Sequence, residues 1–216
     1  RKYQECVGGL MYISSVSRPD LCLPVGILAK HMAEPAQRHW ELLKGVLRYL
    51  NGIRNLGITF GMSSSPLDCW TDSDWGACKD TRRSRSGFVF NLYGGAISWS
   101  SKQQSVVATS TAEAEYVATA LCAREAIWLK KIITFLGIEL KGAVILRCDN
   151  QAAVKMASNQ SDSSRTKHID ITYHFLRHQV TARNIRMVYV STEDNPADMF
   201  TKPCLLYTSP SPRDRG

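Results

Sequence analysis

The stretch AVILRCD, residues 143–149, is apolar at almost every position and ends on an aspartate. Such a run is typical of a strand that is buried on both faces of a sheet, which requires helices on both sides. A long helix is predicted before it, over residues 111–136, and a short helix after it, over residues 150–158. The stretch therefore indicates a sheet covered by helices, as in α/β proteins.

Three more strands are predicted upstream of the long helix, where short apolar runs replace the helical periodicity. The double glycine Gly94-Gly95 lies between two of these runs and predicts a hairpin turn. Downstream, a polar loop is followed by a helix over residues 168–181, a strand over residues 185–191 and a short helix from Pro196. The three upstream strands are expected over residues 67–72, 86–93 and 96–101.

The chain is expected to contain three parts. Residues 1–60 are predicted to be a small helical segment, in which an amphipathic pattern over residues 37–52 ends on a glycine. The run SSSPLD, residues 63–68, is predicted to be a boundary, and residues 67–203 to form the α/β domain. Residues 204–216 are rich in Ser, Pro and Arg, so we expect a disordered tail, and its sequence resembles read-through of a cloning adaptor.

The composition argues against several classes of protein. The 216 residues are 44% hydrophobic, enough for a sizeable core, and their formal net charge of +8 favours a polyanionic partner. No apolar run approaches the roughly 20 residues that a membrane-spanning helix needs, so no membrane partner is expected. The seven cysteines include no CxxC pair and are expected to be reduced thiols. Because the chain begins with Arg1 rather than Met, we expect it to be a piece of a longer protein.

Two aspartates stand two residues apart in the run CWTDSDWGAC, residues 69–78. In an extended strand Asp72 and Asp74 share one face, so the alternation of side chains does not separate them. A bend after Asp72 would turn Asp74 outward, and the Trp-Gly that follows indicates that the strand is ending. The pattern favours Asp72 as a functional carboxylate but does not decide between the two.

The long helix carries two glutamates near its start. Glu115 falls on the apolar half of the helix, where a charged group needs a partner such as a metal ion. Glu113 is expected to point outward and to form a capping box with Ser110, its carboxylate accepting the backbone N–H of the cap. Glu125 also falls in the apolar half, and the pattern does not explain it. This half consists of two adjoining stripes: Val117, Leu121, Trp128 and Phe135, and Ala118, Cys122, Leu129, Ile133 and Leu136.

Two further aspartates lie at the ends of predicted elements. Asp149 closes the buried strand, where ligands gather in α/β sheets, but it is equally suited to cap the helix that follows. Asp198 is the third residue of the terminal helix, after Asn195 as its cap and Pro196, so helix structure explains it as well. Four carboxylates suit two divalent cations that cleave a phosphodiester, although the spacing does not show that they converge.

Four long motifs follow one another between residues 67 and 203: CWTDSDWGACKDTRRSRSGFVFNLYGGAISWSSKQQSVVATSTAEAEYVA, DNQAAV, RTKHIDITYHFLR and YVSTEDNPADMFTKP. Together they resemble the ribonuclease H domain of copia-type LTR retrotransposon polyproteins. Upstream, residues 3–52 resemble the end of the reverse transcriptase of the same family, its thumb or connection region. The resemblance therefore covers most of the chain.

The resemblance implies a ribonuclease H-like fold, a five-stranded mixed sheet with flanking helices, preceded by a small helical segment. It implies that four acids bind metal and catalyse, and that Asp74 is a neighbour that modulates the site. The helical pattern selects one of these acids, Glu115, independently. His168 and Asp170 belong to another motif, for which an auxiliary and a structural role are both open. The implied catalytic and metal-binding residues are Asp72, Glu115, Asp149 and Asp198.

The resemblance also implies two Mg²⁺ ions as cofactors, with Mn²⁺ as a substitute, and an RNA–DNA hybrid as the substrate. Basic and polar side chains are expected to contact the hybrid, although a solvated surface explains them as well. The other expected partner is the remainder of the reverse transcriptase polyprotein, in the cytoplasm within virus-like particles. The expected nucleic-acid contacts are Arg82, Arg83, Lys102, Gln103, Asn150, Arg165 and Lys167.

The implied function is endonucleolytic hydrolysis of the RNA strand of RNA–DNA hybrids during retrotransposon reverse transcription. No polymerase activity is expected, because in the family the polymerase aspartates lie upstream of the segment that begins at Arg1. Integrases and exonucleases of related fold are disfavoured, since integrases use the order Asp, Asp, Glu, whereas here the Glu is second. Another alternative is a catalytically silent, hybrid-binding or structural remnant of a decayed retroelement. All four acids are present, which argues against decay of the site.

Overall fold

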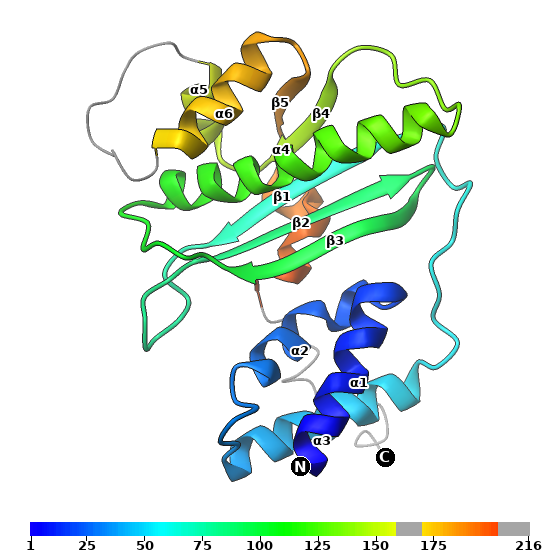
Figure 1. Cartoon of the computed structure of the whole chain (residues 1–216), viewed down its shortest axis with the longest axis vertical. Helices are drawn as coiled ribbons and strands as arrows, with labels where there is room; N and C mark the ends of the chain where they lie inside the picture. Colours follow the sequence, from blue (N-terminus) through cyan, green and yellow to red (C-terminus); the bar gives the residue numbers. More distant parts are fainter. Residues whose placement is uncertain (159–169, 203–216) are drawn as a thin grey trace. The chain divides into compact units, whose positions relative to one another are not determined.

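The computed structural model describes residues 1–158 and 170–202, and it contains two compact units (Figure 1). The first comprises Arg1–Gly57 and the second Ile58–Thr201, and each has its own hydrophobic core. The predicted polar loop before residue 168 and the predicted tail over residues 204–216 lie outside the described residues.

The first unit is helical, as predicted for residues 1–52. It contains α1 (Lys2–Val16), the 3-10 helix η1 (Pro19–Leu21), α2 (Cys22–Ala29) and α3 (Gln37–Gly52). Pro24 does not break α2, because it lies in the first turn, where backbone N–H groups have no partner within the helix. The core of this unit includes Tyr3, Leu28 and Leu43.

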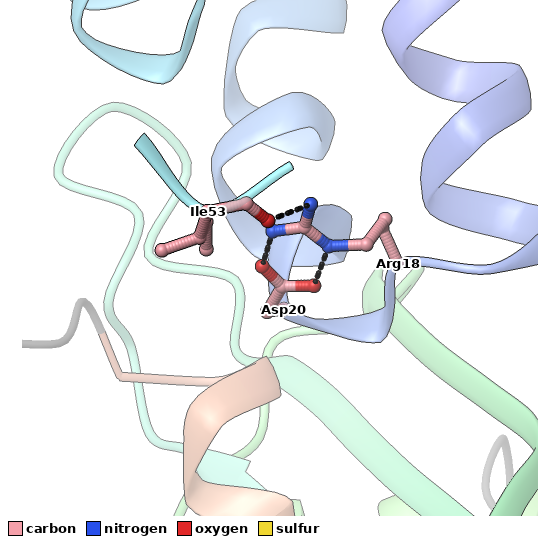
Figure 2. A network of polar contacts seen from close by, with 3 residues as sticks. All are labelled: Arg18, Asp20 and Ile53. Atoms are coloured by element: carbon pink, nitrogen blue, oxygen red, sulfur yellow. Dashed lines mark hydrogen bonds and ion pairs between the residues drawn. The ribbon is translucent and has the colours of Figure 1, made fainter. Parts of the chain in front are cut away.

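A polar network joins the turn before η1 to the end of α3 (Figure 2). Arg18 is only 5% exposed, and its guanidinium donates two hydrogen bonds to Asp20, of 2.8 and 2.6 Å. It also donates to the carbonyl of Ile53 at 3.4 Å. A buried guanidinium is costly unless it is paired. The network therefore stabilises the packing of the end of α3 against the turn before η1.

The second unit is built on a five-stranded mixed sheet, as predicted. The strands β1, β2 and β3 are antiparallel neighbours, whereas β4 runs parallel to both β1 and β5. The hairpin between β2 and β3 turns at Tyr93 and Gly94, which both have positive φ, as a tight two-residue turn requires. The spatial order is β3-β2-β1-β4-β5, with the bounds β1 (Asp68–Asp74), β2 (Arg85–Leu92), β3 (Gly95–Gln103), β4 (Val144–Cys148) and β5 (Ile185–Tyr189).

Helices cover both faces of this sheet (Figure 1). The long helix α4 (Thr111–Phe135) packs on one face, and α5 (Gln151–Ser158) and α6 (Asp170–Thr181) pack against α4. The 3-10 helices η2 (Thr192–Asp194) and η3 (Pro196–Phe200) follow β5. η3 packs on the opposite face from α4, because Phe88 of β2 packs into the core under α4 and the next residue back, Gly87, faces η3.

The C-terminal part of α4 differs from the prediction. Ala118, Cys122, Leu129 and Ile133 are buried, but Trp128 is 54% exposed and Phe135 is 89% exposed, and Leu136, just past the helix, is 66% exposed. The first predicted stripe is therefore exposed at Trp128 and Phe135, whereas the second is buried as far as Ile133 and exposed at Leu136. No helix in the described part of the chain is both long and apolar enough to cross a membrane.

Candidate functional site

Three of the predicted aspartates lie together at one edge of the sheet. Asp72 is in β1 and Asp149 directly follows β4. These strands are parallel neighbours in which Thr71 pairs with Cys148, so the next residue of each strand lies side by side. Asp198 joins them from η3, and one carboxylate oxygen from each of the three lies within 4.8 Å of the others.

The approach of η3 to β1 depends on a glycine. Gly87 of β2 stands opposite Asp72 in the antiparallel register. A Cβ atom at this position would lie 2.7 Å from Cβ of Phe200 and 3.2 Å from the carbonyl oxygen of Ala197. The absence of a side chain here therefore allows η3, which carries Asp198, to lie directly on the strand pair.

Glu115 reaches the same place from α4. It is 6% exposed, as the helical pattern predicts, and its Oε1 accepts a hydrogen bond of 3.1 Å from the backbone N–H of Ser73. The thiol of Cys148 donates to its Oε2 at 3.8 Å. Glu115, Cys148 and Asp149 form a second group whose ligand atoms lie within 4.8 Å of one another. Because Asp149 belongs to both groups, the four predicted acids form one continuous cluster.

The atoms that could bind a metal in this cluster suit a hard divalent cation. Burial, with a further contribution from the charge of Glu115, raises the pKa of the Cys148 thiol, so the thiol stays protonated at neutral pH and acts as a donor. The remaining ligand atoms are carboxylate oxygens, which Mg²⁺ and Mn²⁺ prefer. Asp149 is oriented by the hydroxyl of Thr192, which donates to its Oδ2 at 2.8 Å.

The structure resolves the alternative role of Asp149 as a helix cap. The cap of α5 is Asn150, whose Oδ1 accepts the backbone N–H of Ala153 at 3.0 Å. Asn150 therefore has a structural role, whereas the carboxylate of Asp149 is turned toward Thr192 and the acid cluster. For η3 the expected cap is confirmed, because Oδ1 of Asn195 accepts the N–H of Ala197 at 3.1 Å.

Two other glutamates of α4 have structural partners. Glu113 does not point outward as predicted but is 4% exposed. Its N–H donates to Ser110, as in a capping box, but its carboxylate accepts from Thr109 rather than from the backbone of Ser110. Glu125, which the sequence pattern left unexplained, accepts a hydrogen bond of 2.7 Å from the hydroxyl of Ser98 in β3.

The predicted auxiliary residues are only partly covered. Asp74 is half-buried in β1, opposite Arg85 in the register, and among the described residues it belongs to neither of the two ligand groups. His168 lies outside the described residues. Asp170 is the first residue of α6, and its side chain is not described.

The predicted nucleic-acid contacts gather in part near the β1–β2 loop. Arg82 and Arg83 are exposed in this loop. Lys102 and Gln103 end β3, and the side chain of Gln103 reaches the same loop by donating to the hydroxyl of Thr81 at 3.0 Å. Arg165 and Lys167 lie outside the described residues.

Comparison with known proteins relates these features to a family. No protein-family model matches the chain. The chain is 42% identical over 200 residues to the retrovirus-related Pol polyprotein from transposon TNT 1-94 of Nicotiana tabacum, which covers 93% of the chain. It is 40% identical over 203 residues to the Pol polyprotein from transposon RE2 of Arabidopsis thaliana, which covers 94%. The chain belongs to the copia-type, retrovirus-related Pol polyproteins.

This Pol segment spans a small part of those relatives, 15% of the tobacco protein and 14% of the Arabidopsis protein. Its fold resembles that of the foamy viral protease-reverse transcriptase, solved in complex with an RNA/DNA hybrid. The TM-score is 0.54 at 11% identity, over 88% of this chain and 24% of that chain. This likeness concerns the fold, and the strand order described above agrees with the predicted ribonuclease H-like class.

One cysteine of the Pol segment is expected to be unusually reactive. Hydrogen bonds from the side chain and backbone of Thr81 lower the pKa of Cys78 to about 6, so the thiolate prevails above that pH. The rate at which iodoacetamide alkylates Cys78 can be followed by peptide mass spectrometry. We expect this rate to reach half of its maximum near pH 6. In the control variant Thr81→Val the midpoint should rise. If the midpoint stays near pH 6 in Thr81→Val, the side chain of Thr81 is not what lowers the pKa of Cys78.

Proposed function

We propose that this Pol segment hydrolyses the RNA strand of RNA–DNA hybrids. The observation that carries the proposal is the cluster of Asp72, Asp149 and Asp198, extended by Glu115, in a chain of the copia-type Pol family. The relatedness of the fold to a reverse transcriptase that was solved with an RNA/DNA hybrid supports the same substrate. The positive net charge of +8 is consistent with a polyanionic ligand.

The four acids would hold two divalent metal ions. When bound, such ions lower the pKa of an attacking water and stabilise the leaving oxygen of a phosphodiester. The protein supplies the ligands from β1, α4 and η3 and from the residue that follows β4, and hydrogen bonds orient at least three of the four carboxylates. Ser73 and Cys148 orient Glu115, Thr192 orients Asp149, and the hydroxyl of Thr201 contacts the carboxylate of Asp72.

Binding of the hybrid would rest mainly on its backbone. The exposed Arg82 and Arg83 and the nearby Lys102 are candidates for contacts with phosphates, which do not depend on base sequence. Discrimination of RNA from DNA would rest on the 2′-hydroxyl and on the shape of the hybrid. We therefore expect weak sequence preference and binding that weakens as the salt concentration rises.

The proposal is tested by cleavage of labelled nucleic acids with the whole chain. The substrates are an RNA–DNA hybrid and, for comparison, single-stranded RNA, double-stranded RNA and double-stranded DNA, each with Mg²⁺, Mn²⁺ or a chelator. We expect metal-dependent cleavage of RNA in the hybrid alone, leaving 5′-phosphate and 3′-hydroxyl ends.

The variant Asp149→Asn, purified in the same way, is the control against a contaminating nuclease. Its near-isosteric side chain retains an oxygen that accepts from Thr192 but lacks the charge. We expect it to be folded and inactive. The proposal is wrong if folded wild-type protein leaves the hybrid intact with both ions, or if Asp149→Asn cleaves at the wild-type rate.

A further inference from the structure

A single amide side chain connects β1, which carries Asp72, to η3, which carries Asp198. Asn195 lies between η2 and η3 and is 3% exposed. Its Nδ2 donates to the carbonyl of Thr71 at 3.0 Å, and its Oδ1 accepts from the N–H of Ala197 at 3.1 Å. Both polar ends of this buried side chain are therefore used, and they join the backbone of Ala197 to that of Thr71, which lies 124 residues before Asn195.

The two partners of Asn195 are the residues directly before two of the acids. Thr71 precedes Asp72, and its carbonyl belongs to the peptide unit that joins the two residues. Ala197 precedes Asp198 in η3. A shift of either partner would move the neighbouring carboxylate, so the length of one amide limits the separation of the two acids.

Thr201 makes a second connection between the same two acids. It is 2% exposed, and its Oγ1 is within hydrogen-bonding distance of a carboxylate oxygen of Asp72 and 3.1 Å from the carbonyl oxygen of Asp198. The hydroxyl orients the carboxylate of Asp72, whereas Asn195 holds its backbone. We call Asn195 and Thr201 together the clasp.

We propose that the clasp consists of positioning residues, which hold Asp72 and Asp198 at the separation at which both bind the same divalent ion. This inference rests on the proposed function, because it assumes that the acids bind metal. Removal of a residue that orients a metal ligand typically lowers the metal affinity or the activity by about 10–100-fold. The clasp fits that description, since Asn195 holds the backbone beside both acids and Thr201 contacts the carboxylate of Asp72.

The primary test uses Asn195→Ser in the whole chain. Serine still caps a helix, so η3 should form, but its side chain is too short to reach Thr71. The affinity for Mn²⁺ is measured by calorimetry without nucleic acid, which separates metal binding from catalysis. We expect the dissociation constant for Mn²⁺ to rise about 10–100-fold. High metal concentrations should then restore part of the cleavage activity.

Two further variants distinguish positioning from general stabilisation. Asn184→Ser removes an amide that donates to Gln179 at 3.0 Å, beside Ile185, which pairs with Val144 at the other end of β4 from Asp149. It should lower the thermal stability but leave the Mn²⁺ affinity unchanged. Thr201→Val removes only the hydroxyl of the clasp and should weaken Mn²⁺ binding even if Asn195→Ser does not fold.

The outcomes separate this inference from the function on which it rests. If the clasp variants are less stable but bind Mn²⁺ as the wild type does, the clasp is merely structural and the inference is wrong. If the wild type binds no Mn²⁺, the metal site and the inference both fail. If the clasp variants bind Mn²⁺ about 10–100-fold more weakly than the wild type, the inference holds even in a protein that leaves the hybrid intact.

Discussion

Asp72→Asn is expected to abolish hybrid cleavage, whereas Asp74→Asn is expected to cause a much smaller loss. Asp72 is 1% exposed and shares a ligand group with Asp149 and Asp198. Asp74 lies two residues further along the same strand, yet among the described residues it belongs to neither group. We expect the rate constant to fall by on the order of 10³-fold for Asp72→Asn, as for other groups that stabilise transition-state charge.

Asp72→Asn and Asp74→Asn are also expected to differ in how metal changes their thermal stability. Without metal, the clustered carboxylates repel one another, so removing the charge of the buried Asp72 should leave the metal-free fold as stable as before or more stable. With metal, the wild type gains stability by mass action, in proportion to the logarithm of the ion concentration over its dissociation constant. Asp72→Asn should lose most of this gain, whereas Asp74→Asn should retain it.

The measurements are single-turnover cleavage and thermal unfolding with and without Mg²⁺, on both variants and the wild type. The two variants are expected to differ in rate by about 100-fold or more. Equal losses of rate, or an equal response of thermal stability to Mg²⁺, would mean that the site does not distinguish the two aspartates and that Asp72 is not the ligand.

The choice between these aspartates shows where prediction from the sequence reaches its limit. Apolar periodicity predicted the five strands, the long helix and the inward position of Glu115, because each is a local property. Asp72 and Asp74 have the same parity in one strand, so the alternation of side chains does not separate them. The bend expected after Asp72 was wrong, because β1 continues to Asp74. The difference between the two aspartates arises from the parallel pairing of Thr71 with Cys148, which is a contact between segments far apart in the chain.

The long helix shows a different limit. Its pattern predicted two buried stripes, but Trp128 and Phe135 are exposed. Leu129 and Ile133 lie in the same turns and are buried, so the exposure of Trp128 and Phe135 depends on the side of the helix on which they lie. Hydrophobic character alone therefore did not predict burial.

Asn195 was predicted as the cap of η3 from its place before Pro196, and the structure confirms this role. Its contact with Thr71 had no signal in the sequence, because the two residues are 124 positions apart. Gly87 was missed for a similar reason. A glycine in a predicted strand indicates close approach of some other backbone, but the pattern does not say which segment approaches.

Gly87→Ala is expected to disrupt the site without removing any of its functional groups. The added methyl group would lie 2.7 Å from Cβ of Phe200 and 2.8 Å from Cγ2 of Thr201, and the Cβ atom is fixed by the backbone of Phe200, so no side-chain rotation relieves that contact. η3 must therefore move outward from β2. Overpacking of this kind typically costs about 1–3 kcal/mol of stability.

The expected effect on cleavage is larger than the effect on stability. Moving η3 displaces Asp198 and Thr201 relative to Asp72, which stands opposite Gly87 in the sheet. A misplacement of about 1 Å at a reacting centre costs on the order of 10²-fold in rate, so we expect a loss of at least that size. Binding of Mn²⁺ should weaken as well, because the acids no longer meet at one point.

The control is Gly45→Ala in α3, which makes the same chemical change where a Cβ has space. Among residues 1–158 and 170–202, no heavy atom lies within 4 Å of such a Cβ, apart from the residues next to Gly45 in the chain and the backbone of its own helix. Alanine should stabilise this helix by about 0.5–1 kcal/mol and leave cleavage unchanged. Thermal unfolding and cleavage rates of both variants decide the matter. If Gly87→Ala cleaves as fast as the wild type, the position of η3 does not control the acid cluster, and the role assigned to the clasp loses its structural basis.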